Sequence, residues 1–70
     1  MKIESSSGGQ MNTYWGQSYA SYDAAITAAT EAASKDLGDK TLEWFEVLEF
    51  RGGFDNGRLQ YQTAVRIGYS

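Results

Sequence analysis

The clearest pattern in the chain is a strict alternation over residues 58–69. Its odd positions are apolar or β-branched: Leu59, Tyr61, Thr63, Val65, Ile67 and Tyr69. Its even positions are polar or small: Arg58, Gln60, Gln62, Ala64, Arg66 and Gly68. Successive side chains of a strand point to opposite faces of a sheet, so this pattern predicts a strand with one face buried against a helix and the other face open.

Residues 22–37 carry a helical pattern with clear ends. Ser21 can cap the free amides of the first turn, Asp23 complements the positive end of the helix dipole, and Gly38 can adopt the left-handed conformation that ends a helix. Small and apolar residues recur at the spacing of one helix face: Tyr22, Ala25, Ile26, Ala29, Ala33 and Leu37. This face is narrow and rich in alanine, so the helix can approach a sheet closely.

The stretch 41–52 favours neither face of a strand. Its even side holds Leu42, Trp44, Glu46, Leu48 and Phe50, and its odd side holds Glu43, Phe45, Val47, Glu49 and Arg51. Both sides are half apolar, and one helix can cover only one of them. The uncovered side is therefore expected to form an interface or a ligand site.

Two weaker signals complete the fold. Residues 10–15, QMNTYW, suit a short strand although they alternate poorly. The stretch GGFDNGR contains Asp55, Asn56 and Gly57, which tolerate positive φ and indicate a hairpin turn. The expected class is α+β, in the order β-α-β-β, with a three-stranded antiparallel sheet packed on one helix. Residues 1–9 are interpreted as a disordered tail or cloning remnant, and residues 10–70 as a single domain.

Composition limits how such a domain can be stabilised. A chain of 70 residues buries only roughly 60% of the surface that it exposes when unfolded, and without Cys or His it has neither disulfides nor a zinc site. Self-association is the expected remedy. The net charge of -3 argues against a nucleic-acid partner, and the lack of a long apolar run argues against a signal peptide or a membrane span. A cytoplasmic protein is the expectation.

Several segments together resemble the dodecin family. They are GQSYASYDAAI at 16–26, LEWFEV at 42–47, RG at 51–52, NG at 56–57 and YQTAVRIGY at 61–69. The resemblance rests on their order and spacing and implies a helix cradled by a three-stranded antiparallel sheet, in subunits that assemble as hollow spheres of twelve and bind flavins in pairs. The first strand departs from the family, since dodecins usually have an apolar segment there with Lys or Arg near its start.

The same resemblance implies three site residues. Trp44 matches the tryptophan that stacks on the isoalloxazine ring, Gln62 matches the glutamine that bonds the pyrimidine edge, and Arg51 matches an arginine beside the flavin. The chemistry suits them, because an indole is a good partner for an electron-poor ring and a planar amide both donates and accepts.

Strand parity then answers which side the helix covers. Trp44 and Gln62 share a face only if that face points away from the helix. This assigns Phe45 and Val47 to the helix. It leaves Leu42, Trp44, Leu48 and Phe50 to ligand and neighbouring subunits.

The hypothesis is a bacterial homododecamer that stores riboflavin, FMN or FAD between tryptophans and quenches it. It is not an enzyme, and no catalytic or metal-binding residue is assigned. One alternative is a dodecin-like cage that binds a metal ion or another nucleotide without flavin stacking, and another is a small α/β-barrel-like dimeric monooxygenase. Two interpretations stay open for the charges: Arg51 can be a rim charge paired with Glu49 or Asp55, and Glu46 can form a salt bridge between subunits with Arg58 or Arg66.

Overall fold

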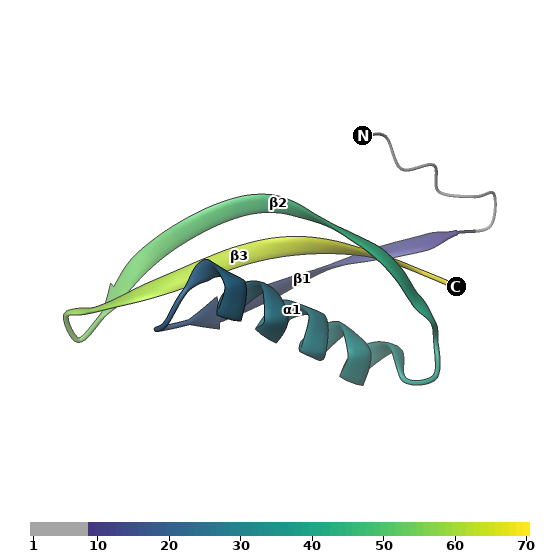
Figure 1. Cartoon of the computed structure of the whole chain (residues 1–70), viewed down its shortest axis with the longest axis horizontal. Helices are drawn as coiled ribbons and strands as arrows, with labels where there is room; N and C mark the ends of the chain where they lie inside the picture. Colours follow the sequence, from purple (N-terminus) through teal and green to yellow (C-terminus); the bar gives the residue numbers. More distant parts are fainter. Residues whose placement is uncertain (1–8) are drawn as a thin grey trace.

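The computed structural model describes residues 9–70 and has one helix packed on one sheet (Figure 1). The elements are β1 (Gln10–Ser18), α1 (Tyr22–Leu37), β2 (Leu42–Asp55) and β3 (Arg58–Tyr69). The strand order is β1-β3-β2, and both pairings are antiparallel. The predicted β-α-β-β fold, with a three-stranded antiparallel sheet wrapped around one helix, is confirmed.

Helix α1 has the ends that its sequence predicts. The Ser21 hydroxyl accepts a hydrogen bond from the Ala24 amide at 3.0 Å, and Gly38 has a φ of 62° with its amide bonded to the Ser34 carbonyl at 3.1 Å. Both groups satisfy backbone atoms that a helix end leaves without partners. The bounds 22–37 are confirmed.

The alanine face of α1 lies directly on the sheet. Ala25, Ala29 and Ala33 are fully buried, and a Cβ built on Gly16 of β1 would meet the Ala29 amide nitrogen at 2.6 Å. Only a glycine permits the helix backbone to approach β1 this closely. Ile67 and Val65 of β3 are the largest apolar side chains that are fully buried in the described chain.

Strand β2 does not keep a single alternation. Its register against β3 shifts between Leu42 and Trp44 and again between Val47 and Glu49. Each β-bulge accommodates one extra residue, so the side chains beyond it change faces. Trp44 stays opposite Gly68 on the face away from α1, and the predicted assignment of Phe45 and Val47 to the helix side is confirmed by their pairing with Ile67 and Val65.

The predicted faces of two other β2 residues were wrong. Leu42 pairs with Tyr69, and Phe50 pairs with Thr63, so both lie on the helix side of the sheet. The ring of Phe50 confirms this, because its centroid is 4.8 Å from that of Tyr22 on α1. The bulges are the physical reason, since strict alternation cannot be extrapolated across them.

Two strand boundaries also differ from the prediction. Strand β1 continues past residue 15 to Ser18, because Gly16, Gln17 and Ser18 pair with the far half of β3. Strand β2 continues through the two glycines to Asp55. The hairpin turn is thus only Asn56 and Gly57, whose φ values of 51° and 80° are those of a two-residue turn between twisted strands.

The helix covers β1 and β3 but scarcely touches β2. In Figure 1 it runs beside β1, and β2 lies on the other side of β3. Large apolar side chains on the helix side of the hairpin therefore remain exposed. We call them the hairpin strip: Leu42, Phe45, Phe50 and Phe54 of β2 and Leu59 of β3.

The predicted tail at residues 1–9 falls almost entirely on residues 1–8, which lie outside the described residues. Within residues 9–70, the single helix is too short and too polar to cross a membrane.

Candidate functional site

The sheet face turned away from α1, here called the outer face, carries all three residues that the sequence proposed for a site. Trp44 pairs with Gly68, and Arg51 pairs with Gln62. Cross-strand partners share a face. The even residues of β3 lie on the face opposite Thr63, Val65 and Ile67, which are buried on the helix side. The second bulge brings Arg51 to this face, whereas strict alternation had placed it with Phe45 and Val47.

Trp44 and Gln62 share a face but do not lie together. Gln62 lies six positions along β3 from Gly68, which Trp44 covers. At about 3.3 Å per residue this is about 20 Å along the strand. Within one subunit, only Arg51 and Gln62 of the three candidates are neighbours.

The indole of Trp44 occupies the space above Gly68. A Cβ at residue 68 would lie 2.6 Å from Cζ2 of the indole and closer still to Nε1 and Cε2. The absence of a side chain at residue 68 thus creates a seat for the indole on the sheet. Trp44 is partly buried there and keeps an accessible surface.

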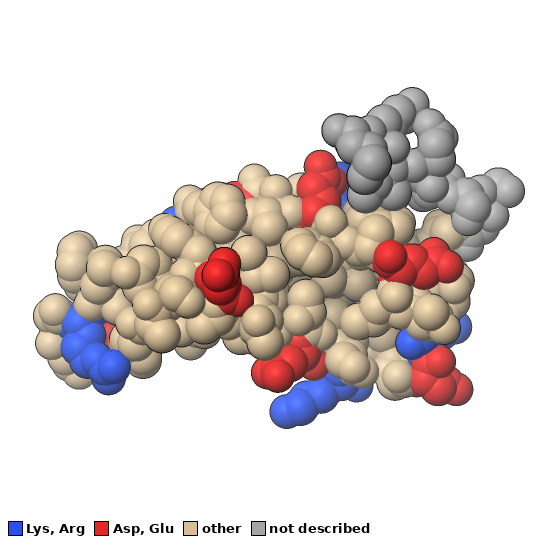
Figure 2. All heavy atoms as spheres, in the orientation of Figure 1, with Lys and Arg blue, Asp and Glu red and all other residues tan. Residues whose placement is uncertain are grey.

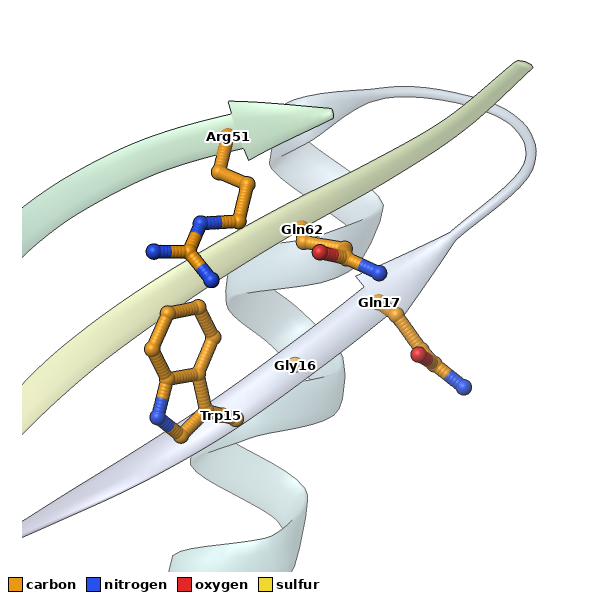
Figure 3. A pocket seen from close by; sticks show the side chains of 5 residues that line it. All are labelled: Trp15, Gly16, Gln17, Arg51 and Gln62. Atoms are coloured by element: carbon orange, nitrogen blue, oxygen red, sulfur yellow. The ribbon is translucent and has the colours of Figure 1, made fainter. Parts of the chain in front are cut away.

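At the other end of the outer face is a cleft of about 310 Å³, shown in Figure 3. It is lined by Trp15, Gly16, Gln17, Arg51 and Gln62. In Figure 3 the Arg51 guanidinium points toward the Trp15 indole, the Gln62 side chain lies to one side of them, and the Gln17 side chain points away. Trp15 and Gln17 were not among the predicted site residues, because the poor alternation of residues 10–15 gives no face for Trp15 and Gln17 lies beyond the predicted end of that strand.

The amide of Gln62 is already fixed on one side. Its Nε2 donates to Oε1 of Gln60 at 2.9 Å. Gln62 is only partly buried, so its carbonyl oxygen and its second N–H remain available. One acceptor and one donor in a common plane suit the edge of a planar heterocycle.

Arg51 is held by two contacts within the subunit. Its Nη2 lies 2.6 Å from Oε2 of Glu49, and its Cζ lies 5.1 Å from the centroid of the Trp15 ring. Of the two partners that the sequence left open for Arg51, Glu49 and Asp55, the structure shows Glu49, and this pairing balances the arginine charge locally. Further along the outer face, Glu46 pairs with Arg66 at 3.2 Å within the same chain.

Two tyrosines with perturbed pKa values lie outside this site. Partial burial raises the pKa of Tyr14, and its hydrogen bond to Asp36 at 2.7 Å adds to the increase, while Asn12 opposes it. The hydrogen bond to Asp55 raises the pKa of Tyr19. Both tyrosines join β1 or its connection to other elements, so their roles are structural.

Charged groups form no obvious centre of reactivity. In the described part of the chain, no group of three or more acidic side chains is placed to hold a metal ion within one subunit. On the face shown in Figure 2, acidic and basic side chains are scattered, and neither sign forms a continuous patch.

The fold and the outer face define a small α+β subunit whose sheet carries its helix on one side and polar and aromatic side chains on the other. The dodecin family model matches residues 12–70, and the chain belongs to the dodecin family. The resemblance inferred from the sequence is thereby confirmed.

Solved structures agree with this assignment. Dodecin from Streptomyces davaonensis is 31% identical, with a TM-score of 0.76 over 87% of this chain and 88% of that one. A protein from Thermus thermophilus is 34% identical, with a TM-score of 0.75 over the same shares of the two chains. Calcium dodecin from Mycobacterium tuberculosis, which has a calcium-binding site, is 19% identical, with a TM-score of 0.75 over 89% and 87%, and shows the fold alone. No curated protein sequence matches the chain significantly.

Proposed function

We propose that this dodecin forms a hollow homododecamer that binds flavins in pairs and quenches them, as a store for riboflavin, FMN or FAD. The observation that carries the proposal is the seating of Trp44 over Gly68 on the open face of the sheet. An indole fixed in this way offers a ready stacking surface, worth about 0.5–1.5 kcal/mol beyond the area that it buries. Electron transfer between the indole and an excited flavin would account for the quenching.

The distance between the site residues supports a shared site. About 20 Å along β3 separates the Trp44 seat from Gln62, which is longer than the three fused rings of a flavin. A flavin that stacks on Trp44 and bonds to Gln62 must therefore take the two residues from different subunits. Binding and assembly are linked in this proposal.

The shape of the subunit supports assembly independently. It measures 45 × 27 × 14 Å, so it is a broad, thin body. One helix covers only β1 and β3, and the apolar side chains of β2 stay uncovered. In the hairpin strip, Phe50 is 57% exposed and Phe54 is 79% exposed. Contiguous exposed apolar side chains of this kind are typical of subunit contacts.

Arg51 is proposed as a peripheral contact of the flavin. Its pairing with Glu49 leaves it a smaller electrostatic contribution than a free guanidinium would make. Dodecins are generally binding proteins. We accordingly propose a binding role without turnover, in the cytoplasm of a bacterium.

The test is a titration of riboflavin, FMN and FAD with the purified protein, in which flavin fluorescence is followed and assembly mass is measured in parallel. We expect quenching that saturates near one flavin per subunit at the mass of twelve subunits. Trp44→Ala should weaken binding by roughly tenfold or more, and Gln62→Ala by a few fold, at unchanged mass. Gln10→Ala is the matched control, because Gln10 is exposed at the far end of β1 and pairs with Tyr69 on the helix side.

The absence of quenching by all three flavins at micromolar protein would overturn the proposal. A parallel titration with Ca²⁺ and with ATP, followed by calorimetry, covers the alternative of a cage for a metal ion or another nucleotide. In that case Trp44→Ala would leave the affinity for the ligand unchanged.

A further inference from the structure

We propose that Trp15 is a second aromatic contact for the flavin, at the end of the ring system that Gln62 bonds, and that it comes from the Gln62 subunit rather than the Trp44 subunit. The inference rests on the proposed function. It assigns each flavin one tryptophan from each of two neighbouring subunits.

The register of β1 against β3 places Trp15 near Gln62. Trp15 pairs with Ala64, and Gln17 pairs with Gln62. Trp15 is therefore only two residues, or about 7 Å, from Gln62 along the strands. The Trp44 seat at Gly68 is four residues, or about 13 Å, from Trp15 along the strands, in the direction away from Gln62.

The surroundings leave the Trp15 indole accessible on the outer face. Trp15 is 50% exposed, and its cross-strand neighbour Ala64 has too small a side chain to cover it. The exposed part of the indole lines the same cleft as the Arg51 guanidinium and Gln62. A planar ligand that stacked on the indole would remove this apolar surface from water.

The size and charge of the cleft define the part of the ligand that it takes. A volume of about 310 Å³ is at the lower end of the range for small-molecule pockets and suits one flat ring system rather than a whole dinucleotide. Glu49 balances the charge of Arg51. The cleft therefore suits a neutral aromatic ring better than a phosphate.

Arg51 also orients the indole. Its guanidinium carbon lies 5.1 Å from the ring centroid, within the range of a cation-π interaction. The ion pair with Glu49 fixes the guanidinium in turn. Trp15 is thus held beside Gln62 before any ligand arrives.

The first experiment compares Trp15→Val and Trp15→Phe with the unmodified protein in titrations of riboflavin and FMN. Trp15→Val should lower the affinity for both flavins by the same factor, roughly three- to tenfold, because the ring and not the phosphate makes the contact. Trp15→Phe should retain most of the affinity. The control Gln10→Ala changes an exposed side chain outside the hairpin strip, at the far end of β1 on the helix side, and should leave the affinity unchanged.

A second experiment uses the unmodified sequence, so it does not require a Trp15 variant to assemble. Both tryptophans are replaced by 5-fluorotryptophan, and their fluorine resonances are followed during flavin titration. Stacking on both indoles should shift both resonances through the ring current of the flavin.

Three outcomes would overturn the inference. In the first, Trp15→Val at full assembly mass binds both flavins with unchanged affinity; in the second, the Trp15 resonance does not move when the Trp44 resonance does. In either case the proposed function stands where Trp44→Ala still weakens flavin binding as expected above. In the third, the unmodified protein binds no flavin, and the proposed function fails together with the inference.

Discussion

The indole of Trp44 fills the space that any side chain on Gly68 would need. The ring atom Cζ2 lies 2.6 Å from the position of a Cβ at residue 68. Gly68 has no left-handed φ that would require a glycine. The glycine is therefore explained by the indole and not by its own backbone, and the two residues act as one unit of the outer face.

Gly68→Ala should consequently impair flavin binding although Trp44 itself is not mutated. The new methyl group must displace the indole from its seat, and we expect the affinity for riboflavin to fall roughly tenfold with the fold retained. Fluorescence titration gives the affinity, and circular dichroism gives the fold. Gly53→Ala is the control, since a Cβ there has no neighbour within 4 Å; equal affinities in the two variants would contradict the prediction.

Gln60 should contribute to binding without contacting the ligand. Its Oε1 accepts from Gln62 Nε2 at 2.9 Å and so fixes the plane of the second amide. We expect Gln60→Ala to weaken flavin binding by about 0.5–1.5 kcal/mol, and Gln60→Glu, which keeps the acceptor, to weaken it less. Isothermal titration calorimetry measures both, and an affinity loss as large for Glu as for Ala would show that Gln60 does not act through Gln62.

The contact between α1 and β1 should tolerate no side chain at residue 16. In Gly16→Ala the added methyl group would be 2.9 Å from Cβ of Ala29, so the helix must move away from the sheet. We expect a loss of about 1–3 kcal/mol in the free energy of unfolding, measured by chemical denaturation. Gly53→Ala again serves as the comparison, and similar stabilities of these two variants would refute the close packing.

Stability at high pH should depend on Tyr14. Burial and the Asp36 carboxylate raise the pKa of Tyr14, so the folded state holds this proton more tightly than the unfolded state. The resulting stabilisation is fully present below the unfolded pKa of about 10 and is lost as the pH rises through the folded pKa. Tyr14→Phe should cost about 1 kcal/mol at neutral pH, and the difference from the unmodified protein should shrink in alkali.

The measurement for Tyr14 is chemical denaturation from about pH 7 to pH 11. Asp36→Asn keeps a hydrogen-bond acceptor for the Tyr14 hydroxyl but removes the charge, so it should lose part of the pH dependence. A difference between Tyr14→Phe and the unmodified protein that does not change with pH would reject the linkage.

Assembly should depend on the hairpin strip. Phe45 is 51% exposed on the helix side of β2, and a carboxylate there would have to be desolvated in any subunit contact. We expect Phe45→Glu to reduce the mass measured by light scattering. Thr13→Glu is the control on the outer face of β1, where Thr13 is exposed. An undiminished mass for Phe45→Glu would remove the strip from the interface.

Helix α1 and strand β3 have the bounds that the sequence predicts, because their signals are local. Ser21 and Gly38 define helix ends through contacts within a few residues, and the alternation of residues 58–69 is unbroken. Strand β2 shows the opposite case. Its faces are predicted correctly for Trp44 and Phe45 but not for Phe50, because a bulge between Val47 and Glu49 has no side-chain signature.

The sequence by itself thus determined the class of fold, through short-range patterns, and the family, through the order and spacing of its segments. The side of the sheet that Trp44 occupies followed from the family resemblance together with strand parity, because the pattern of residues 41–52 alone favours neither side. Only the tertiary structure decided that Arg51 joins Gln62, that Trp15 completes their cleft, and that Trp44 lies about 20 Å away. These relationships depend on the pairing of β1 with β3 and on the register of β2. Strand register is fixed by contacts between distant parts of the chain, which no local pattern contains.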